Sequence, residues 1–160
     1  MCKFEKLKLI YIAFRLMKTK SIEIFTHDIG ETLNITITEN PIHAGFPSPA
    51  ENYLENKLDL NQALIKNPSS TFFARVSGES MIEDGVDDGD LLIIDKSVAP
   101  YDNCLAVCFL DGEFTLKRVK IESDSTLLLV PANKKYLPIK VDKNNDFLVW
   151  GIVKFLIKKV

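Results

Sequence analysis

The chain has 160 residues, 46% of them hydrophobic and 26% charged, which are ordinary values for one soluble globular domain with a modest extension. Its 20 Lys and Arg residues and 22 Asp and Glu residues leave a net charge of −2. No bulk positive field therefore favours binding to nucleic acid or to an anionic membrane surface.

The N-terminal segment contains a short apolar run at Leu7–Phe14 with lysines on both sides. The run is too short to span a bilayer and no A-x-A cleavage site follows it, so we expect neither a membrane anchor nor a secretory signal. Met17 also suits a translation start, which leaves both Met1 and Met17 open as the first residue. Residues 1–16 carry little weight for this reason.

Residues 34–39 (NITITE) form the first segment with a regular pattern. Their apolar residues alternate with polar ones, which predicts a strand. Pro41, Pro47 and Pro49 then predict an extended stretch, because proline lacks an N–H donor and disfavours helix before it. A protease binds its substrate in this extended form.

A short helix is predicted directly after Asp59. Asp59 suits the N-cap, Gln62 follows three residues later, and Pro68 ends the helix. Leu60 and Leu64 give this helix its apolar side.

From residue 71 onward the sequence predicts β structure. Asp111-Gly112 is a strong hairpin signal, because both positions tolerate positive φ. Several short strands at this spacing predict a mostly β fold, with a compact antiparallel sheet or barrel. The expected strands are Thr71–Val76, Leu91–Asp95, Leu105–Leu110, Glu113–Val119, Thr126–Val130 and Phe147–Ile157.

The three cysteines do not predict a disulfide framework. Cys104 and Cys108 lie four positions apart in a predicted strand, which separates their Cα atoms by ~13 Å, too far for a bridge. Cys2 lies near the chain end. We therefore expect a reduced, cytoplasmic protein.

Ser80 is the first candidate catalytic residue. It follows Gly78 and precedes a loop rich in Gly and Asp. A serine between a strand and a turn can expose its hydroxyl while nearby backbone N–H groups point at a developing oxyanion. A serine that bonds its own backbone in the turn is the alternative, and it is the commoner case for an isolated Gly-x-Ser.

Lys117 is the second candidate. It follows the predicted hairpin on a strand whose alternation places Thr115, Lys117 and Val119 on one face. Burial beside an apolar neighbour would lower the lysine pKa from ~10.4 toward neutrality. A neutral amine can then accept the proton of a serine hydroxyl. A solvated lysine on an exposed strand is the alternative.

Other kinds of site have less support. The two histidines, His27 and His43, lie in the irregular N-terminal region, so a Ser-His-Asp triad and a zinc site are both disfavoured. A run of acidic residues lacks the order of a calcium-binding loop and is interpreted as a solvated turn. These residues are Glu83, Asp84, Asp87, Asp88 and Asp90. No cofactor and no metal are expected.

Five short motifs occur in one order along the chain: Gly45–Ala50, Asp59–Gln62, Ser77–Met81, Gly89–Ile93 and Asp111–Thr115. In this order and spacing they resemble the LexA/UmuD family of self-cleaving Ser/Lys (S24-type) peptidases of the SOS response, and its UmuD-like members in particular. The resemblance runs from about Ala44 to the C-terminus. It implies an antiparallel sheet or barrel of the LexA/signal-peptidase type, with a short helix and an extended N-terminal arm.

The resemblance also implies the roles of individual residues. Ser80 corresponds to the nucleophile and Lys117 to the general base, while the amides of Glu79 and Ser80 correspond to the oxyanion donors. The bond between Ala44 and Gly45 corresponds to the one that is cut. Residues 1–44 would then be a flexible arm that self-cleavage removes, and residues 45–160 the β domain.

By the same resemblance, a RecA–single-stranded DNA filament would stimulate self-cleavage. The shortened product would form a homodimer and act as accessory subunit of an error-prone translesion polymerase of the UmuC type. Direct sequence-specific DNA binding is not expected. Whether an arm is cut in its own subunit or across the dimer stays open, as does the role of residues 1–40.

Three rival functions share some of these features. A LexA-type or phage-type transcriptional repressor would need a helix-turn-helix domain, for which about 44 residues are too few. A signal peptidase would need a spanning helix that residues 1–20 do not supply. A pure interaction subunit with an inert Ser/Lys pair would differ only in failing to cut itself.

Overall fold

The computed structural model describes residues 22–25, 34–38, 55–122 and 126–160. Strands dominate this part of the chain. They are β1 (Ile22–Phe25), β2 (Asn34–Thr38), β3 (Glu55–Asp59), β4 (Thr71–Val76), β5 (Leu91–Asp95), β6 (Cys104–Leu110), β7 (Glu113–Ile121), β8 (Leu127–Val130), β9 (Ile139–Val141) and β10 (Phe147–Ile157).

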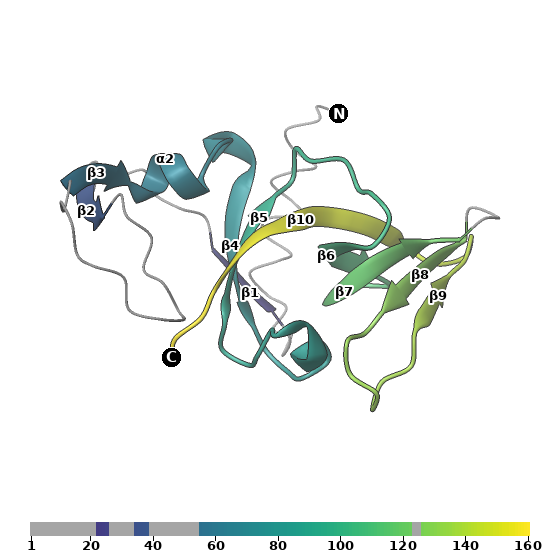
Figure 1. Cartoon of the computed structure of the whole chain (residues 1–160). Helices are drawn as coiled ribbons and strands as arrows, with labels where there is room; N and C mark the ends of the chain where they lie inside the picture. The colour runs from purple at the N-terminus through teal and green to yellow at the C-terminus, as the bar shows by residue number, and fades with distance from the viewer. Residues whose placement is uncertain (1–21, 26–33, 39–54, 123–125) are drawn as a thin grey trace, which may run out of the picture.

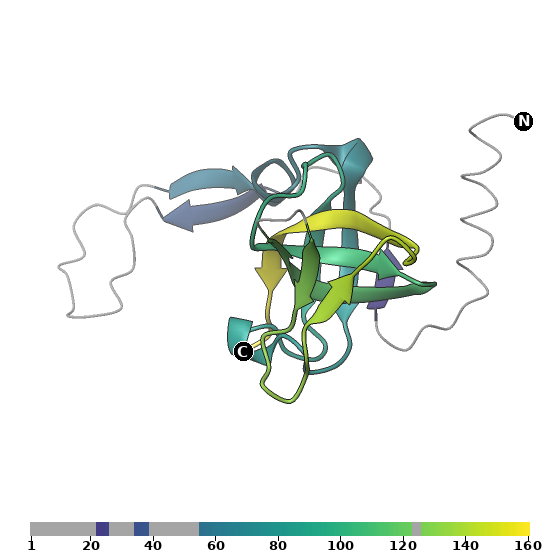
Figure 2. The same ribbon diagram turned by 90° about the vertical axis from the view of Figure 1, so that its right-hand side faces the viewer.

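Eight of these strands form one antiparallel sheet in the order β1-β4-β5-β10-β6-β7-β8-β9. The sheet curls like part of a barrel (Figure 1), and the separate β2–β3 pair projects to one side of it (Figure 2). The predicted fold class, a mostly β chain with an antiparallel sheet or barrel and a short helix, is confirmed.

The predicted strands β4, β5 and β10 have the expected bounds, and β2, β6, β7 and β8 differ by one or two residues. Three strands were not predicted: β1, β3 and β9. They are short or polar, and each is held by a partner distant in sequence or across a long connection. The extended stretch predicted around Pro41, Pro47 and Pro49 lies outside the described residues.

The predicted helix is α2 (Leu60–Leu64). The Asp59 carboxylate caps it by accepting the N–H groups of Asn61 at 2.9 Å and Gln62 at 3.4 Å. The helix ends at Leu64 with Ile65 as its C-cap, before Pro68. None of its residues is buried, so the expected apolar side does not enter the core.

Both faces of β6 are buried, which explains its continuous apolar sequence. Val107 belongs to one core cluster and Ala106 to the other. The first cluster joins β4, β5 and β7 to the turn after β4, and its fully buried members include Ala74, Met81, Val86, Leu92 and Ile94. This cluster therefore supports the segment that carries Ser80.

The β6–β7 hairpin turns at Asp111 and Gly112, whose φ angles are +49° and +96°. This confirms the predicted hairpin, because both turn residues adopt the positive φ that such a connection needs. The register then pairs Ala106 with Lys117. Lys117 thus lies in the middle of a long, well-paired strand.

The long strand β10 joins the two halves of the sheet, pairing first with β6 and then with β5 (Figure 1). Gly151 lies at the point of exchange, beside a register shift. A Cβ atom there would meet Ile94 Cγ2 at 2.6 Å and Lys96 Cγ at 3.2 Å. Only a residue without a side chain fits this crossing unstrained.

A Gly151→Ala variant is therefore expected to lose about 1–3 kcal/mol of unfolding free energy, because the buried, β-branched Ile94 has little room to move away. Urea unfolding measures the change as a lower midpoint at an unchanged slope. Leu148→Ala on the same strand is the control, since Leu148 is 57% exposed. Equal midpoints for the two variants would contradict the prediction.

Candidate active site

Ser80 and Lys117 come together from two separate elements. Ser80 lies in the turn that follows β4, and Lys117 lies on β7. Their side chains meet with Lys117 Nζ 2.9 Å from Ser80 Oγ. The two residues that the sequence indicated as a pair are thus in hydrogen-bond contact.

Lys117 is only 7% exposed. Its amine also lies 2.9 Å from Thr115 Oγ1 and 2.9 Å from the Leu116 carbonyl oxygen. The Thr115 contact fits the predicted alternation, since both side chains leave the same face of β7. Burial lowers the pKa of Lys117 below the ordinary 10.5.

The three contacts of the amine suit two protonation states. As an ammonium group, Lys117 donates one hydrogen bond to each of the three oxygens. As a neutral amine it keeps two N–H donors and one lone pair. The Leu116 carbonyl can only accept, so in the neutral state the lone pair is available to the hydroxyl hydrogen of Ser80.

Cys108 lies on β6, where it pairs with Thr115 in the register that sets Ala106 opposite Lys117. It is fully buried, and burial together with Cys104 raises its pKa to about 12. The thiol therefore stays protonated and offers neither a rival nucleophile nor a counter-ion to Lys117. Both Cys104 and Cys108 are free, as the strand spacing predicted.

The turn that carries Ser80 begins at Gly78, whose φ of +106° disfavours any other residue. The Gly78 N–H donates to Asp88 Oδ1 at 2.7 Å. Within the described residues, the N–H groups of Glu79 and Ser80 donate to no acceptor. Two backbone donors next to the hydroxyl thus remain available for a ligand.

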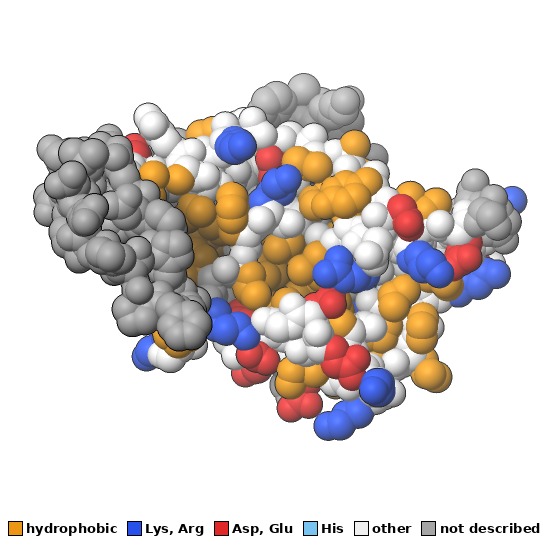
Figure 3. Space-filling view, viewed as in Figure 1, with side chains coloured by type: hydrophobic (Ala, Val, Ile, Leu, Met, Phe, Trp, Pro, Cys, Tyr) orange, Lys and Arg blue, Asp and Glu red, His pale blue; other side chains and the backbone are white. Residues whose placement is uncertain are grey.

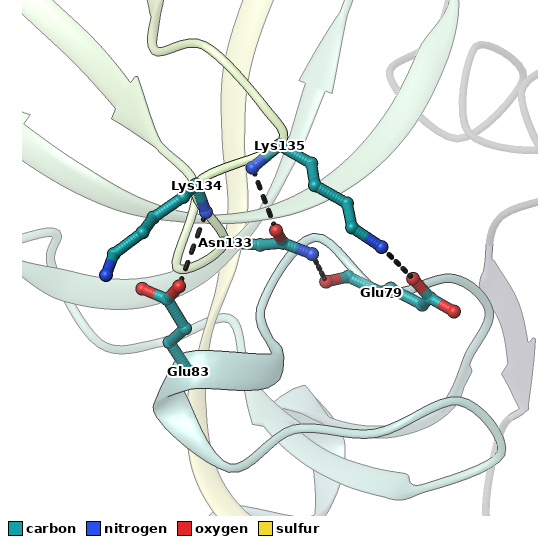
Figure 4. A network of polar contacts seen from close by, with 5 residues as sticks. All are labelled: Glu79, Glu83, Asn133, Lys134 and Lys135. Atoms are coloured by element: carbon teal, nitrogen blue, oxygen red, sulfur yellow. Dashed lines mark hydrogen bonds and ion pairs between the residues drawn. The ribbon is translucent and has the colours of Figure 1, made fainter.

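The carbonyls of the same turn are held by the segment that follows β8. Ala132 N–H donates to the Ser80 carbonyl at 2.9 Å, and Asn133 Nδ2 donates to the Glu79 carbonyl at 2.7 Å. Figure 4 shows the Asn133 side chain between Glu79 and Lys135. Sequence reasoning missed Asn133, because an Asn after a strand is an ordinary turn signal.

Beside the pair lies a cavity of about 320 Å³. One wall comes from the turn after β4 and from β7, and the other from Tyr136, Leu137 and Ile139. All three side chains are exposed, Leu137 the most at 85%. Figure 3 shows apolar side chains around a hollow on one face of the molecule, with acidic ones gathered below it.

The prediction of a solvated acidic turn between β4 and β5 is confirmed for four of its five residues and wrong for Asp90. The four exposed residues are Glu83, Asp84, Asp87 and Asp88. Asp90 is only 7% exposed and accepts the Asp87 N–H at 2.8 Å. Asp88 holds Gly78, and Asp84 forms an ion pair with Arg118 at 2.7 Å. The run is nevertheless anchored, because its carboxylates accept the N–H groups of Gly78 and Asp87 and pair with Arg118.

The remaining expectations fall partly outside the described residues. Ala44, Gly45, His27, His43 and Cys2 all lie there. Across the described ranges, no group of three His, Cys, Asp or Glu residues could hold a metal ion. No helix in the same ranges is long and apolar enough to cross a membrane.

Comparison with known proteins adds independent evidence. Residues 36–154 match the family model described as peptidase S24-like. The chain is 39% identical to the protein SamA of Salmonella typhimurium over 116 residues, which cover 72% of this chain and 79% of SamA. It is 37% identical to MucA of Escherichia coli, over 70% of this chain and 76% of MucA.

The LexA repressor of Clostridium botulinum is also similar, with 41% identity over 76% of this chain and 60% of that repressor. The matched region of the family model spans β2 to β10 and so includes the Ser80 turn, β7 and the segment after β8.

Proposed function

This chain belongs to the peptidase S24 family of self-cleaving proteases, and from that premise we propose that Ser80 and Lys117 are the catalytic pair with which it cuts its own Ala44–Gly45 bond. The LexA/UmuD family identified from the sequence motifs is confirmed by this membership. The observation that carries the proposal is the 2.9 Å contact between a buried lysine amine and a serine hydroxyl beside a cavity.

The reaction begins with proton transfer from Ser80 Oγ to the neutral amine of Lys117. The oxygen attacks the Ala44 carbonyl, and the N–H groups of Glu79 and Ser80 donate to the resulting oxyanion. The ammonium of Lys117 then gives its proton to the departing Gly45 amine. Water attacks the acyl-enzyme with Lys117 again as base, which frees the Ala44 carboxylate and restores Ser80.

Covalent attachment of the substrate segment explains how Ser80 and Lys117 alone can suffice for self-cleavage. Residues 39–54, which contain the bond proposed to be cut, connect β2 to β3, so the substrate is covalently attached to the domain that carries the site. A well-oriented intramolecular reaction gains ~7–11 kcal/mol over the same groups free in solution. The rate then depends on how often the segment occupies the cavity, which a partner can raise by favouring the docked state.

The products would be an arm of residues 1–44 and a domain of residues 45–160. The UmuD-like motifs of the sequence and the similarity to MucA and SamA support a role for the domain as homodimeric accessory subunit of a UmuC-type translesion polymerase in the SOS response. A RecA–single-stranded DNA filament is the proposed activator. The reaction is assigned to the cytoplasm, where the free Cys104 and Cys108 stay reduced.

A LexA-type repressor is the second candidate, favoured by the 41% identity to such a protein. The two functions share the reaction and differ in DNA binding. Titration of the intact chain and of its cleaved product into duplex DNA separates them. A sequence-specific complex that cleavage abolishes would support the repressor.

The decisive experiment is intact-mass measurement after the purified chain is incubated at pH 10, and at neutral pH with and without RecA filaments on single-stranded DNA. We expect two fragments that end at Ala44 and begin at Gly45. A Ser80→Ala variant is expected to remain intact under every condition. A wild-type chain that also remains intact would overturn the proposed function.

Leu137 offers a test of the cavity wall. Because it is 85% exposed and lines the cavity, a Leu137→Ser variant is expected to keep its unfolding midpoint. Self-cleavage should slow about 5–10-fold, since the docked segment loses on the order of 1 kcal/mol of apolar contact. Leu148→Ser is the matched control, and equal rates for both variants would contradict the prediction.

A further inference from the structure

Asn133 is a buried polar side chain, only 8% exposed, in the segment after β8. Its Nδ2 donates to the Glu79 carbonyl at 2.7 Å, and its Oδ1 accepts the Lys135 N–H at 2.9 Å. Figure 4 shows both contacts. Only this orientation works, because a rotated amide would set oxygen against the carbonyl and nitrogen against the N–H.

The Glu79 carbonyl and the Ser80 N–H belong to one peptide unit. The described chain has no cis peptide bond, and in a planar trans unit these two groups point in opposite directions. A hydrogen bond that fixes the carbonyl therefore fixes the direction of the N–H. Asn133 draws the carbonyl to one side, which leaves the Ser80 N–H pointing to the other.

The following peptide unit is held in the same way. Ala132 N–H donates to the Ser80 carbonyl at 2.9 Å. Neighbouring residues of one segment thus hold the carbonyls of Glu79 and Ser80, and so fix the backbone on both sides of the hydroxyl. The Asn133 carbonyl also accepts the Tyr136 N–H at 3.0 Å, which connects these hydrogen bonds to the apolar cavity wall.

The ion pair between Lys135 and Glu79 is too weak to fix the direction of this backbone. Lys135 Nζ lies 3.8 Å from Glu79 Oε2, and both side chains are mostly exposed. Exposed ion pairs contribute about 0–1 kcal/mol and are screened by salt. The buried amide of Asn133, with a donor and an acceptor both engaged, is the directional contact.

We propose that Asn133 is a positioning residue for self-cleavage: its side-chain amide orients the Glu79–Ser80 peptide so that the Ser80 N–H faces the oxyanion that forms on the Ala44 carbonyl. This inference rests on the proposed function, since it assigns a role within that reaction. Asn133 does not touch the reacting atoms. It acts through the Glu79–Ser80 peptide bond, in the turn that carries Ser80.

The test compares full-length wild type with Asn133→Asp, which has the same shape but no Nδ2 donor. Self-cleavage is followed by intact mass from pH 7 to pH 11. We expect the plateau rate to fall about 10–100-fold, less than the 10²–10³-fold cost of deleting an oxyanion donor outright. The pH at which the rate levels off should stay where it is in wild type.

An unchanged pH at which the rate levels off distinguishes a positioning role of Asn133 from a general loosening of the fold. General loosening around Lys117 would hydrate its amine, raise its pKa toward 10.5 and shift the profile to higher pH. Asn133→Ala, which introduces no charge, carries the same expectation if the Asp variant fails to fold. Lys135→Ala is the matched control from the same segment and should cleave at the wild-type rate.

Each outcome decides the proposal. The proposal is supported if a folded Asn133 variant has a lower plateau rate of self-cleavage and its rate levels off at the same pH as in wild type. A wild-type rate in that variant, or a loss that appears only as a shifted profile, overturns it while the proposed function stands. A wild-type chain that is never cut overturns the proposed function and this inference with it.

Discussion

A Lys117→Met variant is expected to lose about 10²–10⁴-fold in self-cleavage rate, the usual contribution of a positioned general base. Methionine has a similar length and suits a site that is 7% exposed. The fold should therefore persist while the proton acceptor beside Ser80 disappears. Quenched time points, analysed by intact mass at pH 10, give the rate.

Two further variants separate base catalysis from charge and from general effects on the strand. Lys117→Arg keeps a cation that cannot deprotonate in this range, and it should be as inactive as the Met variant. Lys120→Met makes the same change at an exposed, ion-paired lysine on the same strand and should cut normally. A Lys117→Met chain that cleaves at the wild-type rate would exclude Lys117 as the base.

The parts of the fold that follow from local sequence were predictable. The bounds of β4, β5 and β10 follow from short apolar runs between turn residues. The turn at Asp111-Gly112 requires positive φ at both positions, which those residues tolerate. Because that turn fixes the register of β7, it also fixes which side chains share a face with Lys117.

The remaining parts depend on contacts distant in sequence. The β3 sequence ENKLD contains one apolar residue, and its strand exists because it pairs with β2. The buried Asp90 has its cationic partner, Lys158, at the far end of the chain, 3.6 Å away in the fold. No local pattern encodes either contact.

The candidate site divides in the same way. The sequence identified Ser80 and Lys117 as residue types suited to one reaction, and hairpin and turn chemistry bring them together. The hydrogen bonds to the Glu79 and Ser80 carbonyls come from Asn133 and Ala132, more than fifty positions away. A single sequence carries no signal for that approach, because Pro131-Ala132-Asn133 looks like any turn after a strand.

Self-cleavage is expected to accelerate about tenfold per pH unit until the pKa of Lys117 is reached, and to level off above it, because only the neutral amine accepts the Ser80 proton. Burial lowers that pKa from 10.5, so the plateau begins below pH 10.5. Initial rates at constant ionic strength, measured in the absence of RecA filaments, give the profile. A flat profile, or a break at or above pH 10.5, would contradict a buried lysine base.

The same shift in pKa predicts a change in stability. Between the lowered pKa and 10.5 the unfolded chain holds a proton on Lys117 that the folded chain does not hold, so the unfolding free energy rises with pH across this window. Urea unfolding across the window should show the rise in the Ser80→Ala protein, which stays intact. The rise should disappear in Ser80→Ala combined with Lys117→Met. Because the catalytic and stability measurements share one titrating amine, a stability rise that begins at a different pH from the catalytic plateau would mean that another group controls the reaction.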